Sequence, residues 1–557
     1  MIRELRIMKK LILKHTLINA VQHDGKASPK AVLGKILAEK PELKEKVREL
    51  VKEVESIVKK VNSLTLEEQK KKLDELSIKI EKKGKEKEEL PPLPNAVKGK
   101  VVTAFPPEPS KFPHIGHAKS AIINYLYARK YGGKFILRFE DSNPLKVRGE
   151  YYEAFKDGLR WLGIEWDEED YLSDHIDKYY EVTEKLLTEG KAYVCTCPVD
   201  RVRRLRRIMK ECEHRNQNVE KNLKLWDKMI EGEVKEGEAN VRLKIDMHHK
   251  NAVMRDPAIM RPLHGEHPRV GTKYKVWPLY DFGTALLDAW EGVTHRVRSK
   301  EFEMRTELQN FIREVCGFKK HPVIMEMARF CIEGSITSGR KIRALLNEGK
   351  LLGWDDPRLV TLVALRKRGF LPEAIREFLL KTGVSKTEST ITWDLLESIN
   401  RHHVDPKANR YFGVLKPVKL SVKNAPDIKE TFAPLHPDFP ERGRRRIPVD
   451  INSIYIEKRD FKEYSGKIVR LKDLFNVKLN KVCEYAGNKL VKSMPKLHWV
   501  SVPNVKVKIV MPDAKAEEII AEPSIKNVKV DDIIQFERIG FCRVDKVSPL
   551  TVYFTHK

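Results

Sequence analysis

A strand, a proline-rich turn, a helix and a second strand follow one another between residues 101 and 139, and this order constrains the fold more than any other feature. Val101 to Phe105 is short and apolar, and the turn that follows it, residues 106–109, holds three prolines. A helix is expected from His114 to the glycine pair at 132–133, and Lys134 to Phe139 is the next apolar strand. Two strands joined by a helix run parallel, so the sequence predicts a nucleotide-type α/β sheet.

Residues 1–95 have a different texture from the rest of the chain. Apolar residues spaced three and four apart predict a helix over Pro41 to Leu76, with runs of lysine between them. This segment is either a solvated helical hairpin or an appendage that binds nucleic acid or a partner. Glu88 to Asn95 holds three prolines and is interpreted as the linker that ends it.

The chain beyond Asn347 changes from helix to strand. Pro357 to Leu380 is expected to be helical, and alternating segments such as Val505 to Val510 follow after about Val404. Prolines and glycines punctuate these strands. The pattern is typical of small antiparallel barrels.

The charge balance indicates a polyanionic partner. Lys and Arg number 107 against 80 Asp and Glu, a formal charge of +27, which favours nucleic acid first and an anionic membrane surface second. No stretch approaches the roughly 20 apolar residues that a membrane span requires, and residues 1–16 lack the pattern of a secretory signal. Seven cysteines in 557 residues fit a reducing compartment. We therefore expect a cytoplasmic protein and exclude secreted, fibrous and membrane-spanning classes.

Two histidines, His114 and His117, stand at the expected start of the first helix of the α/β sheet. A helix N-terminus presents free backbone N–H groups and the positive end of the helix dipole, so it attracts phosphate. Residues three apart share a helix face, so both imidazoles can donate to one triphosphate. Gly116 between them leaves room for a nucleotide to approach closely. The alternative is a pair of surface histidines at a helix start.

The wider context of these histidines is informative. The run Phe105 to Ser120 resembles the ATP-binding signature of class I aminoacyl-tRNA synthetases, and more narrowly the glutamyl/glutaminyl branch of the archaeal and eukaryotic type. Further matches to this family follow in the expected order at residues 137–144, 253–257, 277–282, 353–358, 454–456, 497–501 and 535–540. The resemblance covers about residues 10 to 557.

The resemblance implies a multidomain α/β and β architecture around a Rossmann-type catalytic domain. The expected parts are a helical N-terminal extension (1–95), the catalytic domain (96–345) with an inserted acceptor-end domain (about 195–275), a helical stem-contact domain (346–404) and anticodon-binding antiparallel β-barrels (405–557). The implied reaction is ATP-dependent attachment of glutamate to the 3′ end of tRNA through glutamyl-adenylate, with Mg²⁺ arriving with ATP. Glutamate tRNA is the implied RNA partner, the choice between charging it alone and also charging glutamine tRNA stays open, and a monomer is expected.

The family's site residues carry over to matching positions of this chain. The expected ATP-binding set is Glu108, Pro109, His114, Gly116, His117, Arg329 and Ser338. His114 and His117 would stabilise charge on the phosphates as the substrate carboxylate attacks, which is catalysis by positioning and electrostatics. Glu140 would face the substrate α-amino group and Tyr280 would line the amino-acid pocket. The alternative is that Glu140 and Tyr280 are ordinary strand-end residues that do not contact the substrate.

The choice between glutamate and glutamine depends on charge. A glutamate pocket should offer a cation to the γ-carboxylate, whereas a pocket for neutral glutamine should not. Arg298 stands where glutamyl enzymes of the family have arginine, and it favours glutamate. Its alternative role is an arginine that faces RNA, and a glutaminyl enzyme remains the rival function.

Four soft or imidazole ligands form a candidate metal site. Cys195 and Cys197 precede Cys212 and His214 in a Cys-x-Cys…Cys-x-His pattern that suits tetrahedral Zn²⁺. It is similar to a zinc knuckle found in some glutamyl enzymes. The alternative is four reduced side chains without a metal. Arg204 and Arg207, which lie between the two halves, are expected to face RNA phosphate.

Two positions depart from the family pattern. An arginine that helps to hold the substrate carboxylate is expected where this chain has Ala104, and the key lysine of the mobile second signature is expected at Gly339. A loop shifted by one or two residues would bring Arg340 or Lys341 to the phosphates instead. The rival is a tRNA-binding paralogue that has lost catalysis.

Arg444, Arg445 and Arg446 form a basic run in the strand-rich C-terminal part. In this family the barrels there read the anticodon, and arginines stack on and bridge the unstacked bases of RNA loops. The alternative is a solvated charge run.

Overall fold

The computed structural model describes residues 2–22, 25–39, 47–76, 90–387 and 389–557. The chain divides into two compact units, residues 1–89 and residues 90–557, which are described separately. Among the described residues, each helix is too short or too polar to cross a lipid bilayer.

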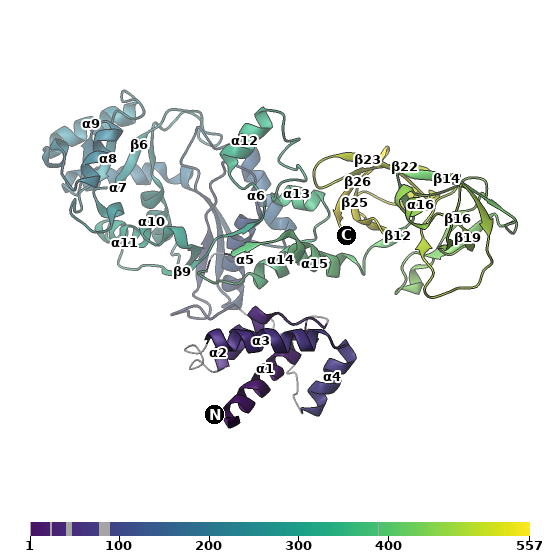
Figure 1. Cartoon of the computed structure of the whole chain (residues 1–557). Helices are drawn as coiled ribbons and strands as arrows, with labels where there is room; N and C mark the ends of the chain where they lie inside the picture. Colours follow the sequence, from purple (N-terminus) through teal and green to yellow (C-terminus); the bar gives the residue numbers. More distant parts are fainter. Residues whose placement is uncertain (1, 23–24, 40–46, 77–89, 388) are drawn as a thin grey trace. The chain divides into compact units, whose positions relative to one another are not determined.

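The first unit is helical (Figure 1). Its helices are α1 (Ile2–Gln22), α2 (Pro29–Glu39), α3 (Val47–Asn62) and α4 (Leu66–Glu75). The helix predicted over 41–76 is therefore two helices, and its residues 41–46 lie outside the described residues. The break comes at Thr65, whose backbone N–H donates to the Glu68 carboxylate (2.8 Å) and whose hydroxyl accepts from the Glu68 N–H (3.3 Å). This reciprocal cap starts α4. One apolar core, including Leu17, Ile36 and Val54, joins the helices.

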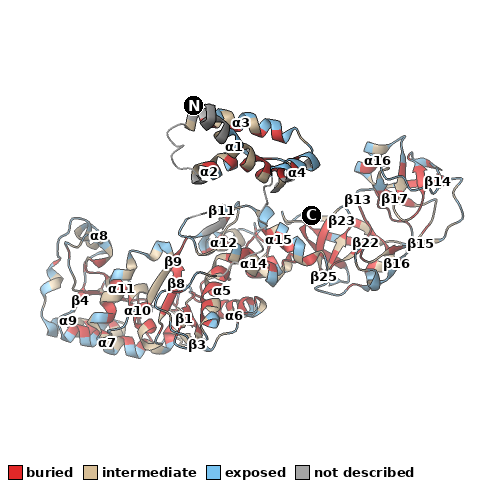
Figure 2. Ribbon diagram, turned by 90° about the horizontal axis from the view of Figure 1, so that it is seen from below, coloured by how far each residue is buried: buried red, intermediate tan, exposed pale blue. Residues whose placement is uncertain are grey.

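The second unit begins with a parallel five-stranded sheet in the order β3-β2-β1-β8-β9. The predicted strand–helix–strand unit is confirmed, because β1 (Val102–Phe105) pairs in parallel with β2 (Lys134–Phe139) and α5 (Ile115–Lys130) connects them. The remaining strands and helices of this part are β3 (Glu168–Tyr171), β8 (His295–Ser299), β9 (Val323–Met327), α6 (Gly149–Trp161), α7 (Ile176–Thr188), α10 (Tyr280–Trp290) and α11 (Arg305–Val315). Figure 2 colours most of β8 as buried. The order of strands reverses between β1 and β8, and open α/β sheets bind ligands at such a point.

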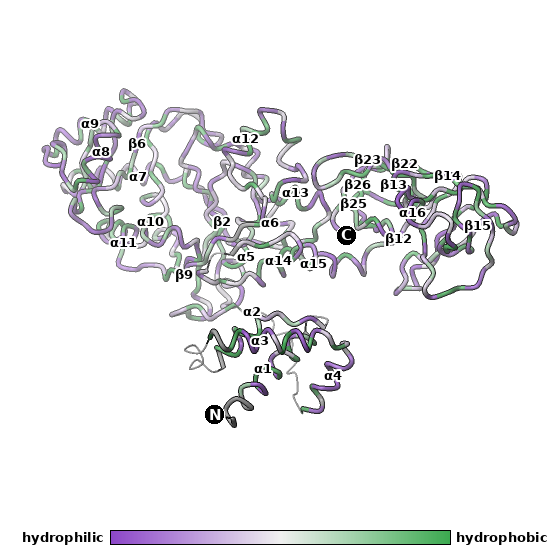
Figure 3. The backbone as a smooth tube through the Cα atoms, in the orientation of Figure 1, coloured by the Kyte–Doolittle hydropathy of each residue, from purple (hydrophilic) through white to green (hydrophobic). Residues whose placement is uncertain are grey.

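An antiparallel sheet is inserted between β3 and β8. It consists of β4 (Ala192–Cys195), β5 (Asn240–Leu243), β6 (Ala258–Pro262) and β7 (Val276–Pro278). The helices α8 (Val199–Arg207) and α9 (Val219–Glu231) accompany it. Figure 3 colours α8 mostly hydrophilic, which fits its run of arginines.

The helical part that follows shares a core with the parallel sheet. Phe105 of β1 belongs to the same buried cluster as Leu362, Phe370 and Leu396. The predicted helix over Pro357–Leu380 is two helices, because Gly369 has φ +89° and Pro372 starts the second one. The elements here are β10 (Phe330–Ile332), α12 (Gly339–Asn347), α13 (Leu362–Lys367), α14 (Pro372–Lys381), β11 (Ser389–Ile391) and α15 (Trp393–Val404).

The C-terminal part consists of two barrel-like sheets, as predicted, in the orders β12-β24-β25-β26-β22-β23-β13 and β17-β14-β20-β19-β18-β21. Most of their pairings are antiparallel, but β12–β24, β14–β20, β18–β21 and β22–β26 run parallel. A hairpin of β15 (Glu430–Pro434) and β16 (Arg444–Pro448) stands beside them. The remaining bounds are β12 (Asn409–Tyr411), β13 (Gly413–Leu415), β14 (Pro417–Lys423), β17 (Ile454–Glu457), α16 (Lys458–Tyr464), β18 (Ile468–Leu471), β19 (Asn476–Lys478), β20 (Val482–Tyr485), β21 (Lys496–Leu497), β22 (Val505–Val510), β23 (Ala516–Ala521), β24 (Ile533–Phe536), β25 (Gly540–Val547) and β26 (Leu550–His556).

Candidate active site

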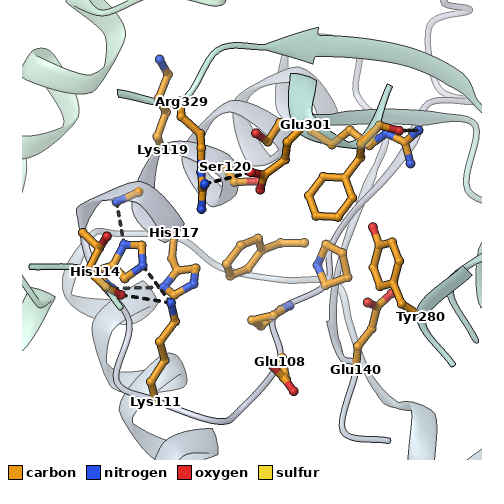
Figure 4. Close-up of a pocket in the computed structure, with 18 of the residues that line it drawn as sticks. Glu108, Lys111, His114, His117, Lys119, Ser120, Glu140, Tyr280, Glu301 and Arg329 are labelled. Atoms are coloured by element: carbon orange, nitrogen blue, oxygen red, sulfur yellow. Dashed lines mark hydrogen bonds and ion pairs between the residues drawn. The ribbon is translucent and has the colours of Figure 1, made fainter. Parts of the chain in front are cut away.

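A cavity of about 640 Å³ opens at the carboxyl ends of β1, β2, β8 and β9. Its wall includes the residues that follow each of these strands, such as Pro106, Glu140 and Ala328. The residues from the sequence analysis that line it are Glu108, His114, Gly116, His117, Glu140, Tyr280, Arg298 and Arg329. Figure 4 shows the histidine pair on one side of the pocket, with Glu140 and Tyr280 on the other.

The two histidines form a stacked pair at the start of α5. Their ring centroids are 3.8 Å apart with 24° between the planes. Nδ1 of His114 accepts from the Gly116 backbone N–H (3.1 Å), and Nδ1 of His117 accepts from the His114 backbone N–H (3.2 Å). A neutral imidazole whose Nδ1 accepts carries its proton on Nε2, so each ring has a remaining donor.

Burial keeps both rings neutral. It lowers the pKa of His114 to about 3, with Lys111 and then Arg329 adding to the effect. Burial also lowers the pKa of His117 well below its usual value, and His114 and Lys111 contribute further. A Cβ at Gly116 would lie 3.0 Å from the His114 ring, so a larger residue here would push that ring from its present place.

Glu140 is held by groups from neighbouring elements. Its Oε1 accepts from Arg138 (3.1 Å) and from the Thr284 hydroxyl. Burial raises the pKa of this carboxyl group, and the Arg138 and Arg296 charges oppose the rise. Tyr280 lies on the same side of the pocket as Glu140 and packs against Phe302, with ring centroids 5.2 Å apart, and burial raises the pKa of Tyr280 to about 12. A carboxylate and a phenol thus meet in one part of the cavity.

A buried charge network lies under this part of the cavity, and the sequence analysis missed it. The Asp288 carboxylate of α10 accepts from Arg138, Arg296 and Arg313 at 3.0 to 3.1 Å. Arg138 also donates to Glu291 (2.7 Å). Arg138, which lies inside the predicted apolar strand Lys134 to Phe139, was the signal that could have revealed it, because a charged residue is unusual at a core position.

Arg298 differs from the arginines of this network. Its guanidinium donates to Gln309 Oε1 (2.7 Å), the Phe302 carbonyl (3.1 Å) and the Thr306 hydroxyl (2.5 Å), all of them uncharged. Within the described parts of the chain it makes no ion pair, and its buried Nε has no hydrogen-bond partner. Burial lowers the pKa of Arg298, and the Arg296 charge adds to this. The cavity therefore contains a buried cation that makes no ion pair with a described residue, although the Asp288 and Glu326 charges act on it from beyond ion-pair distance.

The residues after β10 meet the cavity differently from the prediction. Ser335 and Thr337 belong to the wall, whereas Ser338, Arg340 and Lys341 are exposed and lie outside the cavity lining. Ser338 instead caps α12, and Gly339 is the first residue of that helix. Neither Arg340 nor Lys341 belongs to the cavity wall in this structure, and their contact with the phosphates stays a prediction. Arg329 lines the cavity and forms an ion pair with Glu301 (2.8 Å). Pro109 is buried but is not part of the cavity wall.

The predicted metal ligands come together in the inserted part. One ligand atom from each of Cys195, Cys197, Cys212 and His214 lies within 4.8 Å of the others. His214 offers Nδ1 to the cysteines, 3.4 Å from Cys197 Sγ, while its Nε2 is bound to the Thr196 hydroxyl (2.9 Å). The Arg242 guanidinium lies 3.9 and 4.0 Å from two of the sulfur atoms. Three thiolates and an imidazole around Zn²⁺ carry one net negative charge, which this cation would balance, so the residues fit the ion.

The predicted RNA-facing arginines divide into two kinds. Arg204 and Arg207 of α8 and Arg444 and Arg446 of β16 are exposed. Arg445 is buried, and its guanidinium pairs with Glu522 (2.8 Å) and Glu537 (3.1 Å) over the Phe412 ring. Side chains alternate along a strand, so the expectation that all three arginines of β16 face RNA is corrected for Arg445.

Comparison with known proteins assigns three segments to one family. Residues 100–406 match the family model described as tRNA synthetases class I (E and Q), catalytic domain, and residues 408–494 and 496–545 match models of the anti-codon binding domain of the same group. The glutamate–tRNA ligase of Pyrococcus furiosus is 46% identical over 99% of this chain and 100% of its own length. Those of Thermococcus kodakarensis (45%, 99% and 100%) and Methanocaldococcus jannaschii (42%, 97% and 98%) are also similar.

Proposed function

The chain belongs to the class I tRNA synthetases of the E and Q group, and on this premise we propose that it attaches glutamate to the 3′ end of tRNA. A glutamate carboxylate oxygen attacks the α-phosphorus of ATP, which forms glutamyl-adenylate and releases pyrophosphate. A ribose hydroxyl of the terminal adenosine then attacks the activated carbonyl and releases AMP. Mg²⁺ arrives with ATP and offsets phosphate charge.

The observation that carries the choice of glutamate is the unpaired charge of Arg298. A buried cation with only neutral partners is costly, and a γ-carboxylate would compensate it. Glutamine would not. We assign the α-amino group to Glu140 and the wall of the amino-acid pocket to Tyr280, which lies beside it.

The ATP site is assigned to the other side of the cavity. His114 and His117 donate from Nε2 to the triphosphate, and Glu108, Gly116 and Arg329 complete that side. Arg296 lies one residue beyond the paired positions Thr103 and His295, next to Ala104. We assign to it the carboxylate-holding charge that an arginine at position 104 would have supplied.

We assign the RNA-binding surface to three parts of the chain. The inserted part would bind the acceptor end, the helical part the stem, and the C-terminal barrels the anticodon. The bound RNA is glutamate tRNA, and the assay below tests whether glutamine tRNA is charged as well. A second candidate function, tRNA binding without catalysis, is favoured by Ala104 and Gly339.

Charging assays separate these functions. Purified glutamate tRNA is incubated with ATP, Mg²⁺ and either labelled glutamate or labelled glutamine, and glutamine tRNA is tested in parallel. We expect transfer of glutamate to glutamate tRNA and no transfer of glutamine. Transfer of glutamine would make the chain a glutaminyl enzyme, and RNA binding without any transfer would make it a binding protein.

Zinc content tests the proposed structural ion. We expect about one zinc per chain in the purified protein and a loss of it in Cys197→Ser, because Zn²⁺ needs all four soft ligands of a closed site. Elemental analysis measures the ion, and thermal unfolding reports its contribution to stability. Cys316→Ser, outside the cluster, is the matched control. The assignment would be contradicted if the purified wild type contained no zinc and if added zinc left its melting temperature unchanged.

The alternation in β16 predicts opposite effects for adjacent arginines. Arg446→Ala should weaken tRNA binding about threefold or more with unchanged thermal stability, since an exposed phosphate contact is lost. Arg445→Ala should instead lower the melting temperature, because Glu522 stays buried without its partner. Filter binding at several salt concentrations and calorimetry measure the two effects. Equal losses of RNA affinity in both variants, with stability unchanged, would contradict this division.

A further inference from the structure

We propose that Lys111 supplies the phosphate-binding cation that the second signature of this chain lacks, with its ammonium group acting beside His114 on the ATP triphosphate. The inference rests on the proposed function, since it assigns a cation to the ATP side of the same cavity. It also explains why position 339 is glycine.

The side chain of Lys111 occupies the space next to Gly339. A Cβ placed on Gly339 would lie 3.0 Å from Lys111 Cδ and 3.1 Å from Lys111 Cβ. These distances are tighter than ordinary van der Waals contacts, so a larger residue at 339 would require the Lys111 side chain to shift by a few tenths of an ångström. Gly339 is buried and does not have a positive φ, so its backbone does not require glycine. The side chains that crowd this position are Lys111 and, at 3.3 Å from such a Cβ, the Nη1 atom of Arg343.

The ammonium group of Lys111 is directed at the histidine pair (Figure 4). Nζ lies 3.3 Å from His114 Nε2 and 3.3 Å from the Thr337 carbonyl, and Lys111 belongs to the cavity wall. Since His114 Nδ1 accepts from Gly116, the Nε2 atom carries the proton of the neutral ring. Two donors, Nζ and Nε2, therefore lie side by side and cannot bond to each other. An anion that accepts from both resolves the contact, and a phosphate has the oxygens to do so.

Charges of both signs surround Lys111, with Glu108 opposed to two arginines. Burial lowers the pKa of Lys111, and the Arg329 and Arg343 charges add to this against the opposing effect of Glu108. Arg343 is fixed by the Ser110 carbonyl (2.5 Å), which ties α12 to the turn that holds Lys111. Lys111 and Arg329 both line this part of the cavity, with Arg343 behind them outside the lining, and a polyanion bound there would offset their mutual repulsion. Arg340 and Lys341, by contrast, lie outside the lining.

The test moves the lysine between the two positions. ATP–pyrophosphate exchange is measured with glutamate and glutamate tRNA for the wild type, Lys111→Met, Gly339→Lys and the double variant Lys111→Gly with Gly339→Lys. We expect Lys111→Met to lower kcat about 30-fold or more with an unchanged KM for glutamate, since a charge that contacts the phosphates is removed. Gly339→Lys alone should also be impaired by the steric conflict. The double variant should recover about tenfold over Lys111→Met, a non-additive result that a merely structural role would not give.

Controls fix the interpretation. Lys350→Met, an exposed lysine at the end of the same segment, should leave kcat unchanged. An exchange rate of Lys111→Met within about twofold of wild type would overturn the proposal, as would a double variant no more active than Lys111→Met. If Lys341→Met lowers the exchange rate and Lys111→Met does not, the phosphate-binding cation would be Lys341 of α12.

ATP binding by calorimetry separates this inference from the proposed function. If neither glutamate nor glutamine supports pyrophosphate exchange by the wild type, the proposed function is contradicted. Weaker ATP binding by Lys111→Met would in that case still support the phosphate contact, and unchanged binding would overturn it.

Discussion

Replacement of His117 by alanine is expected to lower kcat for glutamate-dependent pyrophosphate exchange by about 100-fold or more, the cost of losing one preorganised donor at a charged transition state. The ring is buried at the start of α5, and its Nδ1 is occupied by the His114 backbone N–H. Only Nε2 is left for the substrate. The KM for glutamate should change little, because the amino acid binds on the other side of the cavity.

His117→Asn separates the lost donor from lost packing. The amide keeps an N–H near the same place, so this variant should recover part of the rate, whereas the contact with Phe155 (5.1 Å between ring centroids) is weakened in both variants. Thermal unfolding measures the packing loss. Equal rates for the two variants, matched by equal losses of stability, would assign His117 to the core.

The pH dependence provides a further check on the pair. Burial lowers the pKa of His114 to about 3 and that of His117 well below its usual value, so neither ring gains a proton as the pH falls from 8 to 6. A histidine of ordinary pKa would be about three-quarters protonated at pH 6. We therefore expect the wild-type profile of kcat/KM for ATP against pH to show no inflection near pH 6.5 that can be assigned to these histidines. The profile of His117→Asn should have the same shape. Such an inflection would mean that a ring is charged in the free enzyme.

Replacement of Arg298 by glutamine is expected to lower kcat/KM for glutamate about 100-fold, which corresponds to the loss of a buried charge pair. Preference for glutamate over glutamine should fall by a similar factor, since neutral glutamine never used the charge. The reason is the absence of a carboxylate partner for Arg298 among the described residues, in contrast to Arg296 and Arg313, which pair with Asp288. Charging with each amino acid over a range of concentrations measures both parameters.

Lys300→Gln is the matched control for this variant, because it removes an exposed cation two residues further along and should leave both constants unchanged. If Arg298→Gln has the same kcat/KM for glutamate as the wild type, Arg298 has only a structural role through its hydrogen bonds to Gln309 and Thr306. In that case the selectivity would belong to another cation of the cavity, with Arg296 the next to test.

Much of the fold could be predicted from the sequence because the relevant signals are local. Apolar periodicity, the prolines at 106–109 and the glycine pair at 132–133 determine β1, α5 and β2 within a few residues. The spacing of the cysteines likewise brought the candidate metal ligands to attention, and they lie together. Where a turn interrupts an otherwise helical pattern, as at Thr65 or Gly369, one predicted helix became two.

The site required information that local patterns do not contain. Asp288 of α10 meets arginines from β2, β8 and α11, and the pairing depends on how the helices pack on the sheet. Arg445 looked like its neighbours in the sequence, yet the register of β16 buries it and exposes Arg444 and Arg446.

The chain's own sequence thus determined the strand–helix–strand unit, the histidine pair at a helix start and the nature of the partners, because charge, spacing and turn chemistry act over a few residues. Tertiary structure decided which cations reach the cavity. Gly339 and Lys111 are 228 positions apart, and their contact exists only because α12 packs against the proline-rich turn. Steric exclusion between distant segments, which no local pattern encodes, therefore determines where the positive charge lies.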